Sequence, residues 1–75
     1  MLRDFPFALR VIADVMERGR ATHVGDWHDL PATFHLDRAR RHLDLLSQGD
    51  MSEPHLAHAT TRLLMALEIS ERGSV

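Results

Sequence analysis

The sequence predicts an all-α protein, a hairpin or bundle of three helices that forms one small domain over residues 1–75. Apolar side chains recur at helical spacing in three segments, no segment alternates as a strand does, and residues typical of helix ends bound each segment. The expected helices cover about residues 5–18, 33–48 and 53–71. Because a chain of this length buries only a small core, we expect the protomers to assemble into a homo-oligomer.

Residues that start or end helices set the expected boundaries. The first helix follows Asp4, which can cap its start, and ends before Gly19, which suits the left-handed position beyond a helix. The second helix starts with Thr33 as its cap and ends at Gly49. The third helix starts at Ser52, which is followed by an acid and a proline. The apolar stripes expected in the core of the second and third helices are Leu36, Ala39, Leu43, Leu46, Leu56, Ala59, Leu63 and Leu67.

A connection of about residues 20–33 joins the first two helices, with room for one helical turn. It is long for so small a protein, and long ordered loops are usually functional, so we expect a functional loop here. The loop contains the single tryptophan of the chain, Trp27. This side chain is either an anchor in a core or interface, or a stacking platform for a base.

Composition limits the classes of partner. All nine basic residues are arginine, and the formal net charge is −2, which does not suit a protein that binds duplex nucleic acid. The chain has no cysteine, which excludes a disulfide framework and a thiolate zinc site. No apolar run is long enough for a signal peptide or a membrane span, so we expect a cytoplasmic protein without a membrane partner.

Histidine is unusually frequent, with six residues that all lie between positions 23 and 58. Helical spacing places His35, Arg38 and His42 on one flank of the second helix, and the third helix carries a similar stripe of His55, His58 and Arg62 beside its apolar stripe. The short turn after Gly49 makes these two helices antiparallel neighbours, so the two flanks can converge. The resulting pocket would hold many donors and cations and few fixed acids, which suits phosphates and other anions.

Each of these residues also has an ordinary interpretation. A histidine at the edge of a helix core is often solvated or held by a single hydrogen bond, and acids four residues from arginines commonly form surface ion pairs. A zinc site made only of histidines, with His55, His58 and one more, is a further alternative.

Several motifs together resemble a known family. They are the run Phe5–Leu9, the turn His23–Trp27, Arg41-His42-Leu43, Gly49-Asp50 and the block His55–Ala59. In this order and spacing they resemble the N-terminal domain of dATP/dGTP diphosphohydrolases, a family abundant in phages, over about residues 5–68. The resemblance implies an α-helical, oligomeric, nucleotide-handling protein, distantly similar to the all-α (MazG-like) nucleoside triphosphate pyrophosphohydrolases.

The resemblance also points to particular residues. The recurring polar and aromatic positions of the family fall here on Trp27, Asp37, Arg41, His42, Asp50, His55 and His58. Two positions depart from the family pattern, because Asp26 and Arg62 stand where the family usually has asparagine.

The missing acids favour binding over hydrolysis. All-α pyrophosphohydrolases activate water with Mg²⁺ held by a paired-glutamate motif, and this sequence contains no Glu-Glu-x-x-Glu. We therefore expect a phage-encoded sponge with an anti-defence role, which sequesters a phosphorylated nucleotide, including a cyclic immune signal, without hydrolysis, metal or cofactor, in the cytoplasm of an infected bacterium. The expected ligand-binding residues are Trp27, Arg41, His42, His55, His58 and Arg62.

Two alternatives stay open. The first is a (d)NTP diphosphohydrolase that depends on Mg²⁺ or Mn²⁺, with Asp37, Asp50, His55 and His58 as its catalytic residues. The second is a structural or protein-interaction module, in which the apolar stripes and aromatic residues form an interface and the histidines are incidental.

Overall fold

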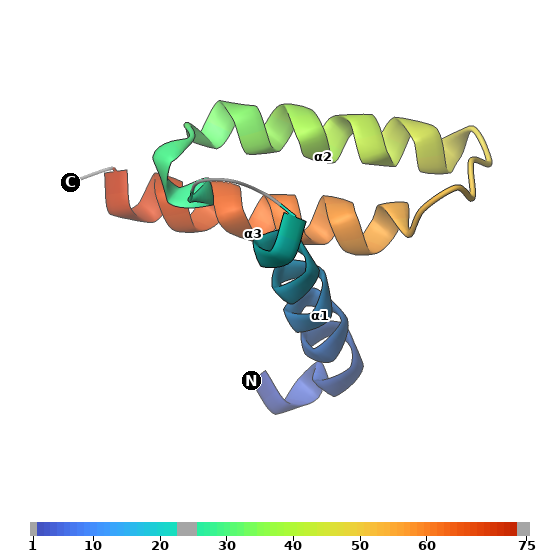
Figure 1. Ribbon diagram of the computed structural model, residues 1–75, viewed down its shortest axis with the longest axis horizontal. Coiled ribbons are helices and arrows are strands. Elements are labelled where there is room, and N and C mark those ends of the chain that lie inside the picture. Colours follow the sequence, from blue (N-terminus) through green and yellow to red (C-terminus); the bar gives the residue numbers. More distant parts are fainter. Residues whose placement is uncertain (1, 23–25, 74–75) are drawn as a thin grey trace.

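The computed structural model describes residues 2–22 and 26–73, and over these ranges the chain is all-α, as predicted, with no strand. Three helices, α1 (Pro6–Thr22), α2 (Ala32–Ser47) and α3 (His55–Gly73), are accompanied by two short 3₁₀ helices, η1 (Leu2–Asp4) and η2 (Trp27–Asp29). Helices α2 and α3 lie antiparallel as a hairpin, and α1 crosses α3 at a steep angle (Figure 1). None of the described helices is long and apolar enough to cross a lipid bilayer.

Both ends of α1 differ from expectation. The carbonyl of Phe5 accepts the first helical hydrogen bond, from the Leu9 N–H at 3.0 Å, so Phe5 holds the cap position and Asp4 instead ends η1. Gly19 does not end the helix, which continues to Thr22. An internal glycine costs a helix only about 1 kcal/mol relative to alanine, and an ion pair at 3.3 Å between Arg20 and Glu17 spans it. Residues 20–22 of the expected loop are therefore helical, η2 is its single turn, and residues 23–25 lie outside the described residues.

Helix α2 covers Ala32–Ser47, so it begins and ends one residue before the expected bounds of about 33 and 48. Pro31 holds its cap position without a side-chain cap, so the expectation that Thr33 caps the helix is wrong. At the other end Gly49 has a φ of 82°, its N–H donates to the Leu46 carbonyl at 3.0 Å, and the Asp50 N–H donates to the Leu45 carbonyl at 3.0 Å. This pair of bonds is a Schellman motif, which requires the left-handed residue that glycine adopts without strain.

Helix α3 begins later than the expected residue 53. The Pro54 carbonyl accepts from the His58 N–H at 3.1 Å, so Pro54 holds the cap position. Ser52, which we expected to start the helix, donates its hydroxyl to the Asp50 carboxylate at 2.6 Å. The polar side chains of this connection therefore bond to one another and do not cap the helix. As a result, Asp50 and Glu53 lie next to the first turn of α3.

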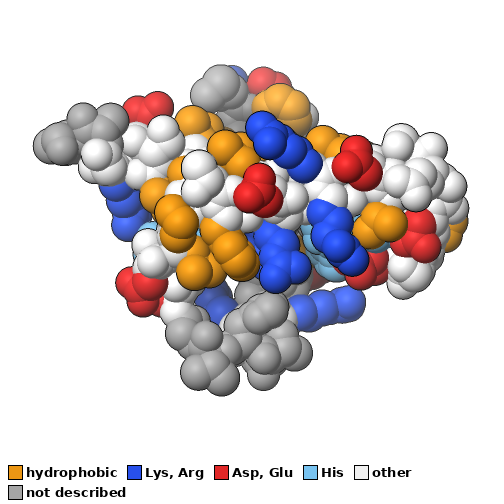
Figure 2. Space-filling model, turned by 90° about the horizontal axis from the view of Figure 1, so that it is seen from above, with side chains coloured by type: hydrophobic (Ala, Val, Ile, Leu, Met, Phe, Trp, Pro, Cys, Tyr) orange, Lys and Arg blue, Asp and Glu red, His pale blue; other side chains and the backbone are white. Residues whose placement is uncertain are grey.

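The core between α2 and α3, called here the helix seam, differs most from expectation. Its buried apolar residues are Ala39, Ala59 and Ala66, and the other buried side chains of the described residues are His35, His55 and Thr61. The two central alanines confirm part of the expected stripes, but Leu36, Leu43, Leu46, Leu56, Leu63 and Leu67 are all exposed. Small side chains let the helices approach closely, and the stripes of larger leucines turn outward. Apolar side chains consequently alternate with charged ones on the surface viewed from above (Figure 2).

Candidate functional site

The helix seam carries two polar clusters rather than one pocket. The histidine–carboxylate cluster lies at the turn end of the hairpin and consists of His42, Asp50, Glu53, His55 and His58. The arginine–aromatic cluster lies further along the same helices and consists of Trp27, Phe34, His35, Arg38 and Arg62. Residues 35 and 42 are seven apart on α2, and residues 55 and 62 are seven apart on α3, so the clusters are separated by about 10 Å, or two helical turns.

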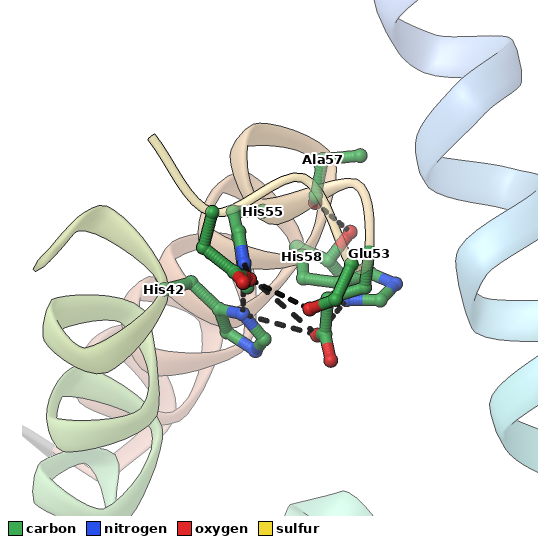
Figure 3. Close-up of polar contacts among 8 residues, drawn as sticks. His42, Glu53, His55, Ala57 and His58 are labelled. Atoms are coloured by element: carbon green, nitrogen blue, oxygen red, sulfur yellow. Dashed lines mark hydrogen bonds and ion pairs between the residues drawn. The ribbon is translucent and has the colours of Figure 1, made fainter. Parts of the chain in front are cut away.

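Three chain segments converge in the histidine–carboxylate cluster (Figure 3). His42 extends from α2, Glu53 from the connection, and His55 and His58 from the first turn of α3. The Nδ1 atom of His42 lies 3.0 Å from Nδ1 of His55 and 3.3 Å from Oε1 of Glu53. The same Glu53 oxygen lies 2.9 Å from Nδ1 of His58, so this carboxylate is the centre of the cluster.

A carboxylate fixes the orientation of the buried His55 ring. Nε2 of His55 donates to Oδ2 of Asp50 at 2.5 Å, and the hydroxyl of Ser52 donates to the same oxygen at 2.6 Å. Because a carboxylate only accepts hydrogen bonds, the proton of the neutral His55 ring is on Nε2 and its lone pair is on Nδ1. In the neutral pair, His42 therefore donates its Nδ1 proton to His55.

The electrostatics of this cluster favour cations. The hydrogen bond from Ser52, together with that from His55, lowers the pKa of Asp50, and the hydrogen bond from His58 lowers the pKa of Glu53. Burial lowers the pKa of His42, against the opposing charge of Glu53. At neutral pH the cluster thus holds two carboxylates beside a neutral His42. The expected pocket with few fixed acids does not form around these histidines, because the connection between the helices contributes both acids.

In the arginine–aromatic cluster, the buried histidine faces a cation instead. Nε2 of His35, a fully buried side chain, donates to the Trp27 carbonyl at 3.0 Å, and its Nδ1 accepts from Nη1 of Arg62 at 3.0 Å. The guanidinium carbons of Arg38 and Arg62 lie 5.1 Å and 5.8 Å from the centre of the Phe34 ring. Burial, and then the neighbouring charge of Arg38, lower the pKa of Arg62.

The two arginines have no acidic partner in the ranges that the structure describes. Trp27 joins the cluster through His35. It is half-buried in η2, with its ring stacked on His28 at 3.6 Å and edge-on to His35 at 6.0 Å. Two neighbouring cations, aromatic faces and no carboxylate form a surface that favours an anion with an aromatic group.

The residues expected in one pocket are divided between places. His42, His55, His58 and Asp50 meet at the turn end, whereas Trp27 and Arg62 belong to the second cluster. Asp37 and Arg41 lie exposed on the outer face of α2. There they line an open depression together with Arg38, Arg40, Asp44, Leu45 and Gln48. There the carboxylate of Asp37 lies 3.9 Å from the guanidinium of Arg40.

Sequence reasoning missed two residues that organise these clusters. Glu53 was interpreted as a helix-start residue, although its place just before the His55 and His58 pair was a usable signal. Phe34 lies outside the expected apolar stripe and gave no signal of its contact with two arginines.

The donors of the histidine–carboxylate cluster do not fit magnesium. Mg²⁺ takes six oxygen ligands in near-octahedral geometry. Here imidazole nitrogens separate the two carboxylates, and one of these, Asp50, already accepts from both His55 and Ser52. A magnesium centre of the pyrophosphohydrolase type is therefore not built from these residues.

The fold and its seam define a small all-α domain in which a helical hairpin carries two polar clusters. The sequence model of the family described as dATP/dGTP diphosphohydrolase, N-terminal, matches residues 1–74 of the chain. The chain therefore belongs to this family, which confirms the resemblance and extends it beyond residues 5–68. No curated protein and no solved structure matches it.

Proposed function

We propose that this chain binds a phosphorylated purine nucleotide at the arginine–aromatic cluster and sequesters it without hydrolysis. The observation that carries the proposal is the pair of guanidinium groups of Arg38 and Arg62, which lie 5.1 Å and 5.8 Å from the centre of the Phe34 ring without an acidic partner among the described residues. The family description, which names dATP and dGTP, supports a purine nucleotide as the ligand.

The chemistry of the cluster suits such a ligand. A guanidinium group forms paired hydrogen bonds to a phosphate, and an aromatic face stacks on a base. Burial, and then the charge of Arg38, lower the pKa of Arg62, and a phosphate beside the two arginines would offset both by supplying negative charge. His35 holds Arg62 in place, which reduces the side-chain entropy lost on binding.

The proposal keeps two of the ligand-binding residues expected from the sequence, replaces one and omits the three histidines. Trp27 and Arg62 remain ligand contacts, and Arg38 replaces Arg41 because it lies beside Arg62. His42, His55 and His58 face carboxylates and leave the set of phosphate contacts.

Sequestration is favoured over hydrolysis by the positions of the acids. Asp37 is exposed on the outer face of α2, whereas Asp50 bonds to His55 at the turn, so the four residues of the enzyme alternative do not converge. The alternative of a (d)NTP diphosphohydrolase keeps one specific support, the description of the family itself.

Self-association is part of the same proposal. The outward leucine stripes of α2 and α3, with Phe5 and Phe7 near the start of α1, leave large apolar side chains exposed on a single protomer. A second copy of the chain would bury these side chains. We therefore propose a small homo-oligomer that acts as a nucleotide sponge of phage origin. Sedimentation of the purified chain over a range of concentrations measures this directly.

The test is a binding experiment with the full chain and a panel of dATP, dGTP, dTTP, AMP and cyclic dinucleotides. Isothermal titration calorimetry measures affinity, and chromatography after incubation with Mg²⁺ or Mn²⁺ detects products. We expect a purine nucleotide to bind and to be recovered intact, and Arg38→Gln or Arg62→Gln to weaken binding roughly tenfold or more.

Arg40→Gln is the matched control, since Arg40 is an exposed arginine of α2 outside the cluster. Equal losses in Arg38→Gln and Arg40→Gln would place the phosphate elsewhere. A metal-dependent product that disappears with a chelator would establish the enzyme alternative, and binding of no nucleotide would favour the interaction module.

A further inference from the structure

We propose that the histidine–carboxylate cluster binds a transition-metal ion of the zinc class, with Nδ1 of His42, Nδ1 of His55 and Oε1 of Glu53 as ligands. These three atoms lie 3.0, 3.3 and 3.9 Å apart, and each is within 4.8 Å of the others. In a tetrahedral zinc site with bonds of about 2.0–2.1 Å, ligand atoms are separated by about 3.4 Å. The triangle of donors therefore already has nearly the dimensions of one face of such a site.

The ligand atoms are prepared by their neighbours. Asp50 accepts the Nε2 proton of His55, which leaves the Nδ1 lone pair directed at His42, and Ser52 holds Asp50 in turn. A carboxylate behind a ligating histidine is the usual outer partner in metal sites, where it fixes the tautomer and raises the basicity of the ring. His58 donates to the ligand oxygen of Glu53 and has the same positioning role on the other side.

Charge and access both suit a cation. Two carboxylates lie at the donors: an oxygen of Asp50 is bonded to the His55 ring, and Oε1 of Glu53 lies 3.3 Å from Nδ1 of His42. The Glu53 side chain is 43% exposed and that of His42 is 17% exposed, so an ion reaches the three donors from solvent. The protein then supplies three ligands, and a water molecule from the open side completes the four.

The donor set selects the class of metal. Imidazole nitrogens suit Zn²⁺, Co²⁺ and Ni²⁺, whereas Mg²⁺ and Ca²⁺ require oxygen ligands. When the ion binds Nδ1 of His42, the proton on that nitrogen transfers through solvent to Nε2 of the same ring, so both rings stay neutral and both Nδ1 lone pairs face the ion. The site is independent of the proposed nucleotide site, which lies about two helical turns away.

The experiment uses the full, untagged chain after removal of metal with a chelator. Zn²⁺ is titrated in competition with a chromophoric chelator, and Co²⁺ is titrated while its visible absorption is recorded. We expect one Zn²⁺ per protomer, the intense d–d bands of four-coordinate Co²⁺, and no competition from Mg²⁺.

Variants assign the site to its residues. We expect His42→Ala and Glu53→Gln to weaken Zn²⁺ binding at least tenfold, and Asp50→Asn, which removes the negative charge of the outer partner of His55, to weaken it about 10- to 100-fold. His28→Ala is the control, because His28 is an exposed histidine that pairs with Asp26 outside the cluster. Far-ultraviolet circular dichroism shows whether His42→Ala still folds. If it does not, Glu53→Gln tests the metal site instead, because the Glu53 side chain is exposed and its substitution should leave the hairpin folded.

Three results would overturn the proposal. They are binding of less than one Zn²⁺ per protomer at micromolar protein, unchanged affinity in Glu53→Gln, and an equal loss of affinity in His28→Ala. Arg38→Gln, which tests the nucleotide site, should bind Zn²⁺ as the parent chain does, so that failure of one proposal is distinguishable from failure of the other.

Discussion

The two clusters of the helix seam are built on the same helices, and each is organised around one buried histidine, yet they suit opposite charges. His55 donates to a carboxylate, and its other nitrogen faces a second histidine. His35 donates to a backbone carbonyl, and its other nitrogen accepts from a guanidinium group. The comparison teaches that a buried imidazole takes its role from its partners, because either ring nitrogen can donate or accept.

The largest expected effect comes from removing one histidine at a time. His35→Leu should lower the free energy of unfolding by about 2 to 4 kcal/mol, because it leaves the partly buried guanidinium of Arg62 and the Trp27 carbonyl without a partner. His55→Leu should cost less, because the side chain of Asp50 is 37% exposed and can turn to water. Urea denaturation of metal-free protein measures both, and the reverse order would contradict our comparison.

A change between the clusters should disturb both. Ala59 is 1% exposed and lies about one helical turn from both His55 and Arg62 on α3, so Ala59→Leu forces the helices apart. We expect a loss of about 2 kcal/mol, typical of overpacking. The same substitution at Ala13, which is exposed on α1, is the control and should change stability little. Equal effects at the two positions would mean that the seam is not closely packed.

A smaller effect is expected at the turn that holds only one of the clusters. Gly49→Ala places an alanine at a φ of 82°, which costs about 1 kcal/mol although nothing lies within 4 Å of the added Cβ. It should weaken the proposed Zn²⁺ site without changing nucleotide binding at the other cluster. Gly73→Ala also meets nothing within 4 Å and has no left-handed φ, so it is the matched control for denaturation.

The smallest effect concerns acid stability near Trp27. The backbone N–H of His28, and then its ring, lower the pKa of Asp26. The folded state therefore binds the carboxylate form more tightly than the unfolded state does, and this stabilisation is present above the ordinary pKa of about 3.9 and lost as the pH falls through the folded value. Thermal melts of Asp26→Asn should differ from those of the parent at about pH 6, and the difference should shrink as the pH falls below about 3.9. A constant difference would exclude this pair as a source of pH dependence.

Much of the fold was predictable because it depends on local signals. Helical spacing gave the three helices, and Gly49 gave the turn that makes α2 and α3 neighbours. The sequence could not give the rotation of each helix about its axis. Leucine stripes are the stronger signal of a core, but here alanines face each other, so the adjacent histidines are buried and the leucines are exposed.

The candidate site was predictable in its histidines and not in its acids. His42, His55 and His58 meet as the hairpin argument implied. Glu53 has the pattern of a helix start, but it accepts a hydrogen bond from Nδ1 of His58 and lies 3.3 Å from Nδ1 of His42. Arg38 and Arg41 lie three residues apart on α2. The rotation of α2 about its own axis decides which of the two lies beside Arg62. Such choices depend on tertiary packing rather than on spacing along the chain.

The Schellman turn at Gly49 also bears on the order in which the hairpin assembles. His42 and His55 are 13 residues apart in the chain, whereas His35 and Arg62 are 27 apart. Contacts that close shorter loops cost less chain entropy and form earlier. We expect a larger Φ value for His42→Ala than for Arg62→Ala, which folding kinetics would measure. The hairpin then closes from its turn toward its open end, and the arginine–aromatic surface is the last part of the seam to be completed.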